Sequence, residues 1–214
     1  MVANRKIAFI NLDTRQVEIT PIPDEWRRKY IGGRGLGTYL ACRDAASECD
    51  PLAPGNPVVI SAGLLAGTLS SPCALTTLTT QSPLTGFLES AHLPGRFAAE
   101  MRWAGFDPLV ITGRARRWAS IYIHDGAIRI YNTPHLKGAG LTRVSDQLRR
   151  DLRDDDVKTI AIGPAGENRG RFATLADDLG HVTGRTGLGA VLGAKRIKAC
   201  LLYTSDAADD YLTV

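Results

Sequence analysis

The sequence predicts a mixed α+β fold, in one large domain or at most two small ones, rather than a doubly wound sheet. Segments with strand character outnumber segments with helical periodicity. The two kinds do not alternate steadily along the 214 residues. Pairs of strand-like segments also flank Asp13-Thr14-Arg15 and Asp125-Gly126, which are turn sequences typical of β-hairpins.

The first half of the chain begins with one of these hairpins. Apolar and polar residues alternate over Lys6–Leu12 and Gln16–Pro21, which predicts two paired strands. Asp24 opens a short helix, because acidic residues are favourable in a first turn. A glycine-rich turn then leads into a helix from about Leu36 to Ala46, and the β-branched run Val58–Ala62 predicts a short strand.

The middle of the chain is less regular, and the second half again shows clear elements. The Ser- and Thr-rich segment Thr68–Thr80 is expected to be extended. The segment GRFAAEMRWA places three apolar residues on one face of a helix that Gly105 closes. The remaining predicted elements are strands Leu109–Thr112, Ser120–His124 and Ala127–Tyr131, helix Leu141–Leu152, strand Thr159–Ile162, helix Gly187–Ile197 and the apolar segment Ala199–Tyr203.

Two pairs of similar segments hint at an internal structural duplication. The stretches Gly33-Arg34-Gly35-Leu36-Gly37 and Arg185-Thr186-Gly187-Leu188-Gly189 both lead into a predicted helix, in opposite halves of the chain. Short strands that end in glycine, VVISAG and TIAIG, also occur in both halves.

The composition indicates an ordinary globular protein of 44% apolar and 22% charged residues. Its net charge of +4 is mild and its charges are interleaved, so no nucleic-acid partner is expected. There is no apolar run of about 18 residues and no signal-peptide core at the start, so no membrane association is expected. The four cysteines form no CxxC pair, which favours free thiols and a cytoplasmic location.

The two glycine-rich turns admit two interpretations. Backbone N–H groups at a helix start, with Arg34 or Arg185 as a guanidinium fork, are suited to binding phosphate. Glycines equally serve tight turns and close helix packing. Neither turn follows a clear strand with GxGxxG spacing and no P-loop lysine is present, so a nucleotide fingerprint is not indicated.

Polar side chains near other turns are also ambiguous. Glu167 and Asn168 follow a predicted strand and either position a ligand or cap the turn. His92 lies next to a Pro-Gly turn and His181 directly precedes the Gly184 turn, and each is either a ligand or an ordinary loop histidine. No carboxylate pair, Ser-His-Asp arrangement or metal-ligand cluster can be assembled, so we expect no catalytic residue in this chain.

Seven motifs lie in order between Arg5 and Ala199: KIAFINLDTRQVEI, IGGRGLGTYL, AGLLAGT, TQSPLTGF, AEMRWAGFDPLVITGRA, IAIGPAGEN and GRTGLGAVLGAKRIKA. Together they resemble the N-terminal domain of the tungsten-containing aldehyde ferredoxin oxidoreductase family. One such motif would be weak, but seven in the family's order are specific. We therefore assign residues 1–203 to this type of domain.

The resemblance implies two β-sheets with a few packed helices, forming a base on which a tungsten or molybdenum bis-pterin cofactor lies. In that family, later domains enclose the cofactor and hold a 4Fe-4S cluster through cysteines, so those domains are the expected partners. The full enzyme would oxidise an aldehyde to a carboxylic acid and pass electrons to ferredoxin or another acceptor. It would often be a homodimer, and the present segment alone would be inactive.

The resemblance also implies where the cofactor phosphates and a bridging magnesium ion would lie. The implied cofactor-binding residues are Ala91, His92, Gly95, His181, Val182, Gly184, Arg185, Gly187 and Gly189. The backbone carbonyls of His92 and Val182 would hold the magnesium ion. Family members often carry an arginine in the segment that matches Pro72–Thr77, where this chain reads PCALTT.

Residues 204–214 do not continue the family pattern. We expect this acidic tail to be non-native or disordered, and the chain to be a piece of a longer enzyme. The alternative is a stand-alone phosphate- or nucleotide-binding module that uses the glycine-rich turns without redox activity.

Overall fold

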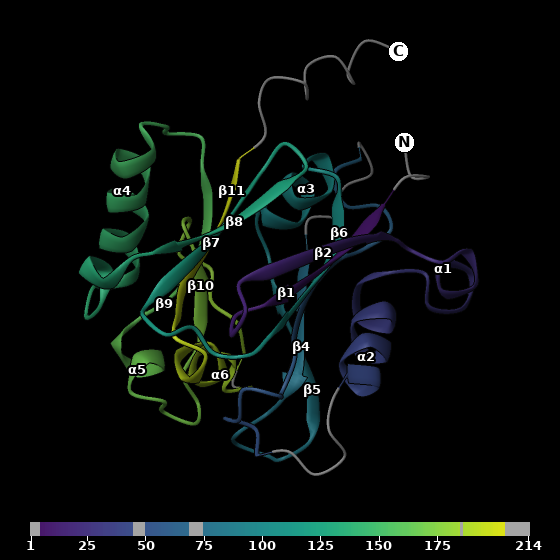
Figure 1. Cartoon of the computed structure of the whole chain (residues 1–214), viewed down its shortest axis with the longest axis horizontal. Coiled ribbons are helices and arrows are strands. Elements are labelled where there is room, and N and C mark those ends of the chain that lie inside the picture. The colour runs from purple at the N-terminus through teal and green to yellow at the C-terminus, as the bar shows by residue number, and fades with distance from the viewer. Residues whose placement is uncertain (1–4, 45–49, 69–74, 185, 204–214) are drawn as a thin grey trace.

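The computed structural model describes residues 5–44, 50–68, 75–184 and 186–203, whose strands form two mixed sheets (Figure 1). The six-stranded sheet has the order β2-β1-β6-β3-β4-β5, with β1 (Lys6–Asn11), β2 (Gln16–Pro21), β3 (Val58–Ala62), β4 (Thr76–Gln81), β5 (Leu88–Leu93) and β6 (Phe106–Thr112). The five-stranded sheet has the order β10-β9-β11-β7-β8, with β7 (Ala119–His124), β8 (Ala127–Asn132), β9 (Lys158–Ile162), β10 (Leu175–Asp177) and β11 (Ile197–Tyr203). The predicted α+β class with two sheets is confirmed.

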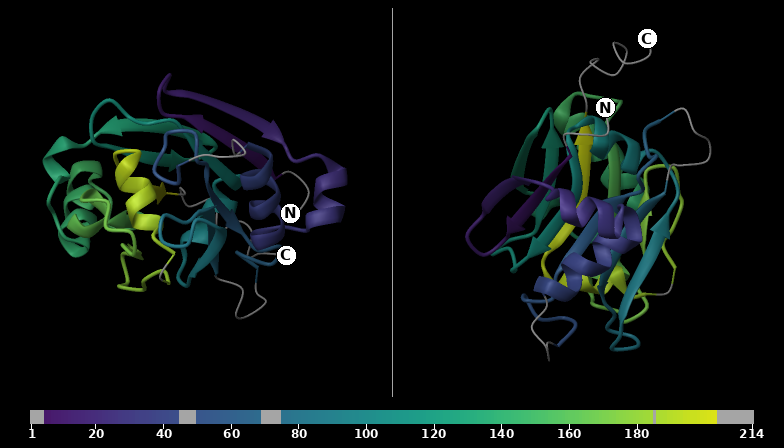
Figure 2. Two further views of the ribbon diagram at one scale, coloured as in Figure 1. Left: turned by 90° about the horizontal axis from the view of Figure 1, so that it is seen from below. Right: turned by 90° about the vertical axis from the view of Figure 1, so that its right-hand side faces the viewer.

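The two sheets share one hydrophobic core, and helices lie within it and around it. The helices are α1 (Asp24–Tyr30), α2 (Gly33–Asp44), α3 (Phe97–Trp103), α4 (Leu141–Leu152), α5 (Pro164–Glu167) and α6 (Leu188–Ala194), with a 3-10 turn at Pro134–Leu136. Apolar residues of α3 and α6 belong to the shared core. Helix α2 packs on the outer face of the six-stranded sheet through Leu36 and Leu40, and α4 packs on the other sheet through Val144 and Leu148. The left view of Figure 2 shows α4 (green) and α2 (blue-purple) on opposite sides of α6 (yellow).

Strand pairing confirms an internal duplication. In the first half, β1 forms a hairpin with β2 and pairs in parallel with β6. Strand β3 then pairs antiparallel with both β6 and β4. The second half repeats these pairings in the same directions, with β7, β8, β11, β9 and β10 in the places of β1, β2, β6, β3 and β4. Each half also has a β-bulge at the start of its last strand, β6 or β11. The duplication therefore includes the position of the β-bulge.

Only one of the two pairs of similar segments occupies equivalent positions in the two halves. VVISAG and TIAIG are β3 and β9, which correspond. The glycine-rich stretches do not correspond, because α2 follows a hairpin whereas α6 precedes a last strand. By position, α2 corresponds to α4, and α6 corresponds to α3. The predicted correspondence of the two glycine-rich stretches was therefore wrong. Their similar sequences reflect a shared need for close helix packing, which arises at different places in the two halves.

Several element boundaries differ from the sequence prediction for local reasons. Helix α2 begins at Gly33 rather than near Leu36, so the first glycine-rich stretch is its first turn. A Cβ atom at Gly37 would lie 3.0 Å from Ser61 Oγ and 3.1 Å from Thr79 Oγ1, so this glycine allows close helix–sheet packing. The prediction missed β5 and β10 because LESAHL has no β-branched residue and LAD is too short to show alternation.

The extended segment predicted over Thr68–Thr80 is a strand only from Thr76, and residues 69–74 lie outside the described ranges. The same holds for the tail predicted over 204–214. Of the helices in the described ranges, none combines the length and the apolar character that a membrane span needs.

Burial of β11 leads to a prediction about thiol reactivity. Burial raises the pKa of the Cys200 thiol to about 12, whereas Cys42 is exposed. At pH 8 roughly one Cys200 in ten thousand is therefore a thiolate, which is the reactive form. We expect iodoacetamide to alkylate Cys42 in the native protein and Cys200 only after unfolding, as read by peptide mass spectrometry. Alkylation of both at equal rates without denaturant would contradict the burial of β11.

Candidate cofactor-binding site

Two loops that sequence reasoning selected, one from each half, lie in contact. The first loop joins β5 to α3 and contains Gly95, whose φ of +114° is a left-handed conformation. The second joins β10 to α6 and begins at Asp177. A Cβ atom at Gly95 would overlap Asp177 Oδ2 and lie 3.7 Å from His181 Nδ1. Both loops precede the helix that leads to a last strand, and the counterpart of the first loop is the part of the second loop that follows the bridge of Val182 with β10.

The Asp177 carboxylate shapes the second loop. Its Oδ1 accepts hydrogen bonds from the backbone N–H groups of Leu179 at 3.0 Å and His181 at 2.8 Å. Its Oδ2 lies 2.8 Å from His181 Nδ1. The Asp177 side chain is 3% exposed and that of His181 is 44% exposed. The carboxylate is therefore buried beneath a histidine ring that remains half open to solvent.

Backbone pairing fixes the direction of the Val182 carbonyl. Val182 forms an antiparallel bridge with Ala176 of β10. The flanking hydrogen bonds run from Thr183 N to Leu175 O and from Asp177 N to His181 O. Val182 is thus in a non-hydrogen-bonded pair, whose own N–H and C=O point away from the neighbouring strand. This geometry leaves the Val182 carbonyl facing away from β10.

The glycines of the second loop divide into two groups. Cβ atoms at Gly187 and Gly189 would lie 2.8 Å from Pro83 Cγ and 2.5 Å from Thr174 O, so both positions serve close packing. A Cβ atom at Gly184 would meet nothing within 4 Å. Thr186 is buried, and its Oγ1 has no hydrogen-bond partner among the described residues. Open space at Gly184 and an unpaired hydroxyl at Thr186 suit a polar ligand; Arg185 lies outside the described residues.

The β5 residues contribute less than the sequence prediction allowed for. Ala91 is buried in the core opposite Leu78, so its side chain does not reach the two loops. His92 points to the opposite face of the sheet, where its Nδ1 lies 3.2 Å from Thr77 Oγ1. The rings of His92 and His181 therefore do not form a common cluster, and only the backbone of His92 remains available for the predicted role.

Sequence reasoning missed Asp177 and left Glu167 undecided. Asp177 has a recognisable signal, because an Asp at a loop start often accepts hydrogen bonds from N–H groups further along the chain. Glu167 accepts hydrogen bonds from Gly138 N at 2.8 and 3.0 Å and from Lys198 Nζ. Lys198 also donates to Ala139 O at 2.8 Å. Glu167 is thus engaged in a buried ion pair that supports the fold.

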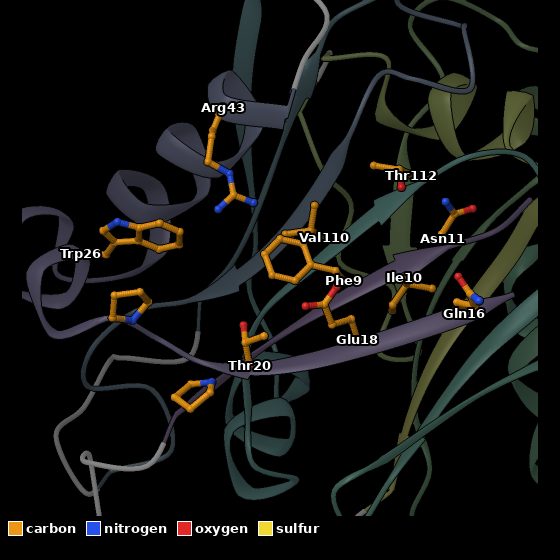
Figure 3. Close-up of a pocket in the computed structure, with 12 residues that line it drawn as sticks. Phe9, Ile10, Asn11, Gln16, Glu18, Thr20, Trp26, Arg43, Val110 and Thr112 are labelled. Atoms are coloured by element: carbon orange, nitrogen blue, oxygen red, sulfur yellow. The ribbon is translucent and has the colours of Figure 1, made fainter. Parts of the chain in front are cut away.

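A separate groove of about 650 Å3 lies on the outer face of the six-stranded sheet (Figure 3). The Arg43 guanidinium lies 5.2 Å from the ring centre of Phe9 and 5.1 Å from that of Trp26. Such distances are typical of cation–π contacts. None of the lining residues belongs to the two loops, so this groove is not part of the candidate site. Within the described ranges, no group of three or more His, Cys, Asp or Glu side chains is arranged to hold a metal ion.

Comparison with known proteins agrees with the resemblance seen in the sequence. Residues 7–204 match the family described as aldehyde ferredoxin oxidoreductase, N-terminal domain. The chain is 37% identical to the tungsten-containing aldehyde ferredoxin oxidoreductase of Pyrococcus furiosus over 89% of its own length and 31% of that enzyme. It is 29% identical to the aliphatic sulfonate oxidoreductase, WOR-like subunit, of the same organism, over 92% of this chain and 34% of that protein.

A solved structure is similar over nearly the whole chain. It is the active site complex BamBC of benzoyl coenzyme A reductase with 1,5-dienoyl-CoA, with a TM-score of 0.90 and 28% identity over 94% of this chain and 31% of that one. The chain thus spans about a third of the length of these relatives. A family match over nearly all of its residues, with this fold, shows that the chain belongs to the aldehyde ferredoxin oxidoreductase family and represents its N-terminal domain.

Proposed function

We propose that this chain is the cofactor-binding domain of an oxidoreductase that uses a tungsten or molybdenum bis-pterin cofactor. The observation that carries the proposal is the contact between Gly95 and the Asp177–His181 segment. Loops from the two halves of a duplicated fold meet there, which suits a ligand with two similar halves. A bis-pterin cofactor is such a ligand, and each of its pterins carries a phosphate.

The residues present fit this group. Phosphates need N–H or O–H donors and close backbone approach. The loops offer the open position at Gly184, the half-exposed ring of His181 and the Thr186 hydroxyl, which has no hydrogen-bond partner among the described residues. The negative charge of Asp177 is offset by the two N–H donors and the ring nitrogen around it. The carbonyls of His92 and Val182 would supply oxygen ligands to a bridging magnesium ion, since Mg2+ prefers oxygen.

In the proposed mechanism this domain binds and orients the cofactor. When bound, the tungsten centre supplies two-electron redox chemistry. Residues of the two loops would hold the phosphate ends of the cofactor. The longer parent would oxidise an aldehyde to a carboxylic acid and pass electrons through a 4Fe-4S cluster to ferredoxin. The cluster ligands would come from the part of the parent beyond this domain.

The names of these relatives refer to more than one substrate. Similar chains occur in enzymes named for aldehyde, aliphatic sulfonate and benzoyl coenzyme A substrates. Related domains therefore accompany different substrate chemistries. An aldehyde remains our proposal because the four tungsten enzymes at 32–37% identity bear that name.

Elemental analysis of the full-length protein that contains this chain tests the proposal. We expect tungsten or molybdenum together with iron, and a fluorescent pterin product after oxidative denaturation. The control is the same protein produced in medium without tungstate and molybdate, which should lose the metal and its activity with aldehydes. A protein that carries bound nucleotide and no metal would instead support the stand-alone phosphate- or nucleotide-binding module.

A further inference from the structure

We infer that Asp177 is a positioning residue of the candidate cofactor-binding site, and that its contact with Gly95 holds the two loops in one fixed arrangement. The inference rests on the proposed function, because it assigns a task to residues of the same site. It concerns a residue that would touch no ligand itself but would set the orientation of the groups that do.

Three donors converge on the buried carboxylate of Asp177. Two backbone N–H groups and a ring nitrogen of the same loop lie within 3.0 Å of its oxygens. Hydrogen bonds to a charged acceptor are shorter and stronger than neutral ones. Removing the carboxylate would leave three polar groups of one loop without their partner. The carboxylate therefore adds three side-chain contacts to the backbone hydrogen bonds that hold the loop over residues 178–182.

The first loop approaches the Asp177 carboxylate closely at Gly95. At Gly95 a Cβ atom would overlap Asp177 Oδ2 and lie 3.5 Å from Asp177 Cγ. The backbone of one half of the fold thus packs directly on the carboxylate of the other half. Any side chain at position 95 would push the two loops apart. Their separation is set at this contact, and it determines the spacing of any two phosphates held between them.

The contact between Asp177 and His181 leaves the second ring nitrogen of His181 available to a ligand. Because His181 Nδ1 faces Asp177, the ring orientation is fixed and Nε2 lies on the far side of a half-exposed ring. Nε2 has no hydrogen-bond partner in the part of the chain that the structure describes. The same loop geometry turns the Val182 carbonyl away from β10. The Asp177 carboxylate therefore holds the His181 ring in a set direction, beside a Val182 carbonyl whose direction is set by backbone pairing with β10.

The experiment compares Asp177→Ala with Asp178→Ala in the full-length protein. Asp178 is the neighbouring acid, and its Oδ2 pairs with Arg149 Nη2 of α4 at 2.8 Å, away from the first loop. We expect Asp177→Ala to lower the tungsten or molybdenum content per protein by about tenfold or more, as loss of an outer-shell partner does. Hydrogen exchange at residues 178–183 should also become faster. Asp178→Ala also removes a nearly buried ion-pair partner but leaves the contact with Gly95 and the hydrogen bonds of Asp177 intact, so its folded fraction should keep its metal content within about twofold of the wild type.

A pair of glycine variants separates the loop contact from backbone strain. Gly95→Ala and Gly180→Ala both place alanine at a positive φ, of +114° and +88°. At Gly180 the new Cβ atom meets nothing within 4 Å, whereas at Gly95 it meets Asp177. We expect Gly95→Ala to reduce the metal content as Asp177→Ala does, and Gly180→Ala to retain it. Equal losses in the two variants would show that φ strain, not the contact, is responsible, and would overturn the inference.

The conservative variant Asp177→Asn keeps an acceptor for the two backbone N–H groups, and we expect it to restore much of the metal content. It also carries the test if Asp177→Ala fails to fold. Wild-type metal content and unchanged exchange at residues 178–183 in Asp177→Ala would overturn the positioning role and leave the proposed function standing. A wild-type protein without tungsten or molybdenum would refute the proposed function instead, and the exchange measurements would then decide the loop contact alone.

Discussion

Replacing Asp107 with alanine is expected to destabilise the domain by about 3–5 kcal/mol, because it breaks a buried ion pair and leaves one partner uncompensated. Arg5 Nη1 lies 2.7 Å from Asp107 Oδ2, and the two side chains are 6% and 0% exposed. Asp107 Oδ1 also accepts a hydrogen bond from Ala62 N at 3.0 Å. The substitution would therefore leave the Arg5 guanidinium in the interior without its charged partner, with only its hydrogen bond to Ile31 O at 3.3 Å, and the Ala62 N–H without its acceptor. Urea unfolding measures the change in free energy.

The directions of the pKa shifts explain why losing one partner destabilises the domain by more than the intact ion pair stabilises it. Burial raises the pKa of the Asp107 carboxyl, and the Ala62 amide and the Arg5 guanidinium only partly oppose this. Burial likewise lowers the pKa of Arg102, and neighbouring Arg5 lowers it further. For Asp107 and for Arg102, the cost of desolvating the charge thus exceeds what the neighbouring groups return. Removing the Asp107 charge leaves the desolvation cost of the remaining buried charges in place and removes the attraction that offset it.

Asp24 provides the matched control for Asp107. Its carboxylate pairs with Arg27 at 3.2 Å, but the side chain is 79% exposed. An exposed pair of this kind contributes about 0–1 kcal/mol, so Asp24→Ala should unfold at nearly the wild-type urea concentration. Equal losses for Asp107→Ala and Asp24→Ala would contradict the burial of the Arg5–Asp107 pair.

Replacing Gly193 with alanine is expected to cost about 2–3 kcal/mol, because the helix α6 has no room for a side chain at this position. A Cβ atom there would overlap the carbonyl oxygen of Gly166 in α5 and lie 2.7 Å from its carbonyl carbon. Both neighbours are backbone atoms, so neither can move aside as a flexible side chain would. The higher helix propensity of alanine offsets only about 1 kcal/mol of this cost. The melting temperature of the variant reports the loss.

Gly63 is the control for Gly193. It follows β3, has no positive φ, and a Cβ atom there would meet nothing within 4 Å. Gly63→Ala should therefore change the free energy of unfolding by no more than about 0.5 kcal/mol. If Gly193→Ala were equally mild, α5 and α6 would have to be further apart than the structure places them.

Local sequence patterns were sufficient for most of the secondary structure. Alternation and β-branched runs predicted β1, β2, β3 and the β7–β8 hairpin, and helical periodicity predicted α4 over its observed range. The ordered motifs also pointed to the family, which the comparisons show. These features were predictable because each is set by residues close together in the chain. β10 was missed because three residues carry too little periodicity to be recognised.

The sequence by itself therefore determined the α+β class, the hairpins, the return of similar strands in the two halves and the family. The tertiary structure alone decided which glycines serve packing, which carboxylates are buried and which loops meet. Asp107 finds its partner 102 residues away, and Gly95 meets a carboxylate from the other half of the fold. Residue type and spacing do not encode such contacts locally, because they arise only when the two sheets pack and bring distant backbone segments within van der Waals distance.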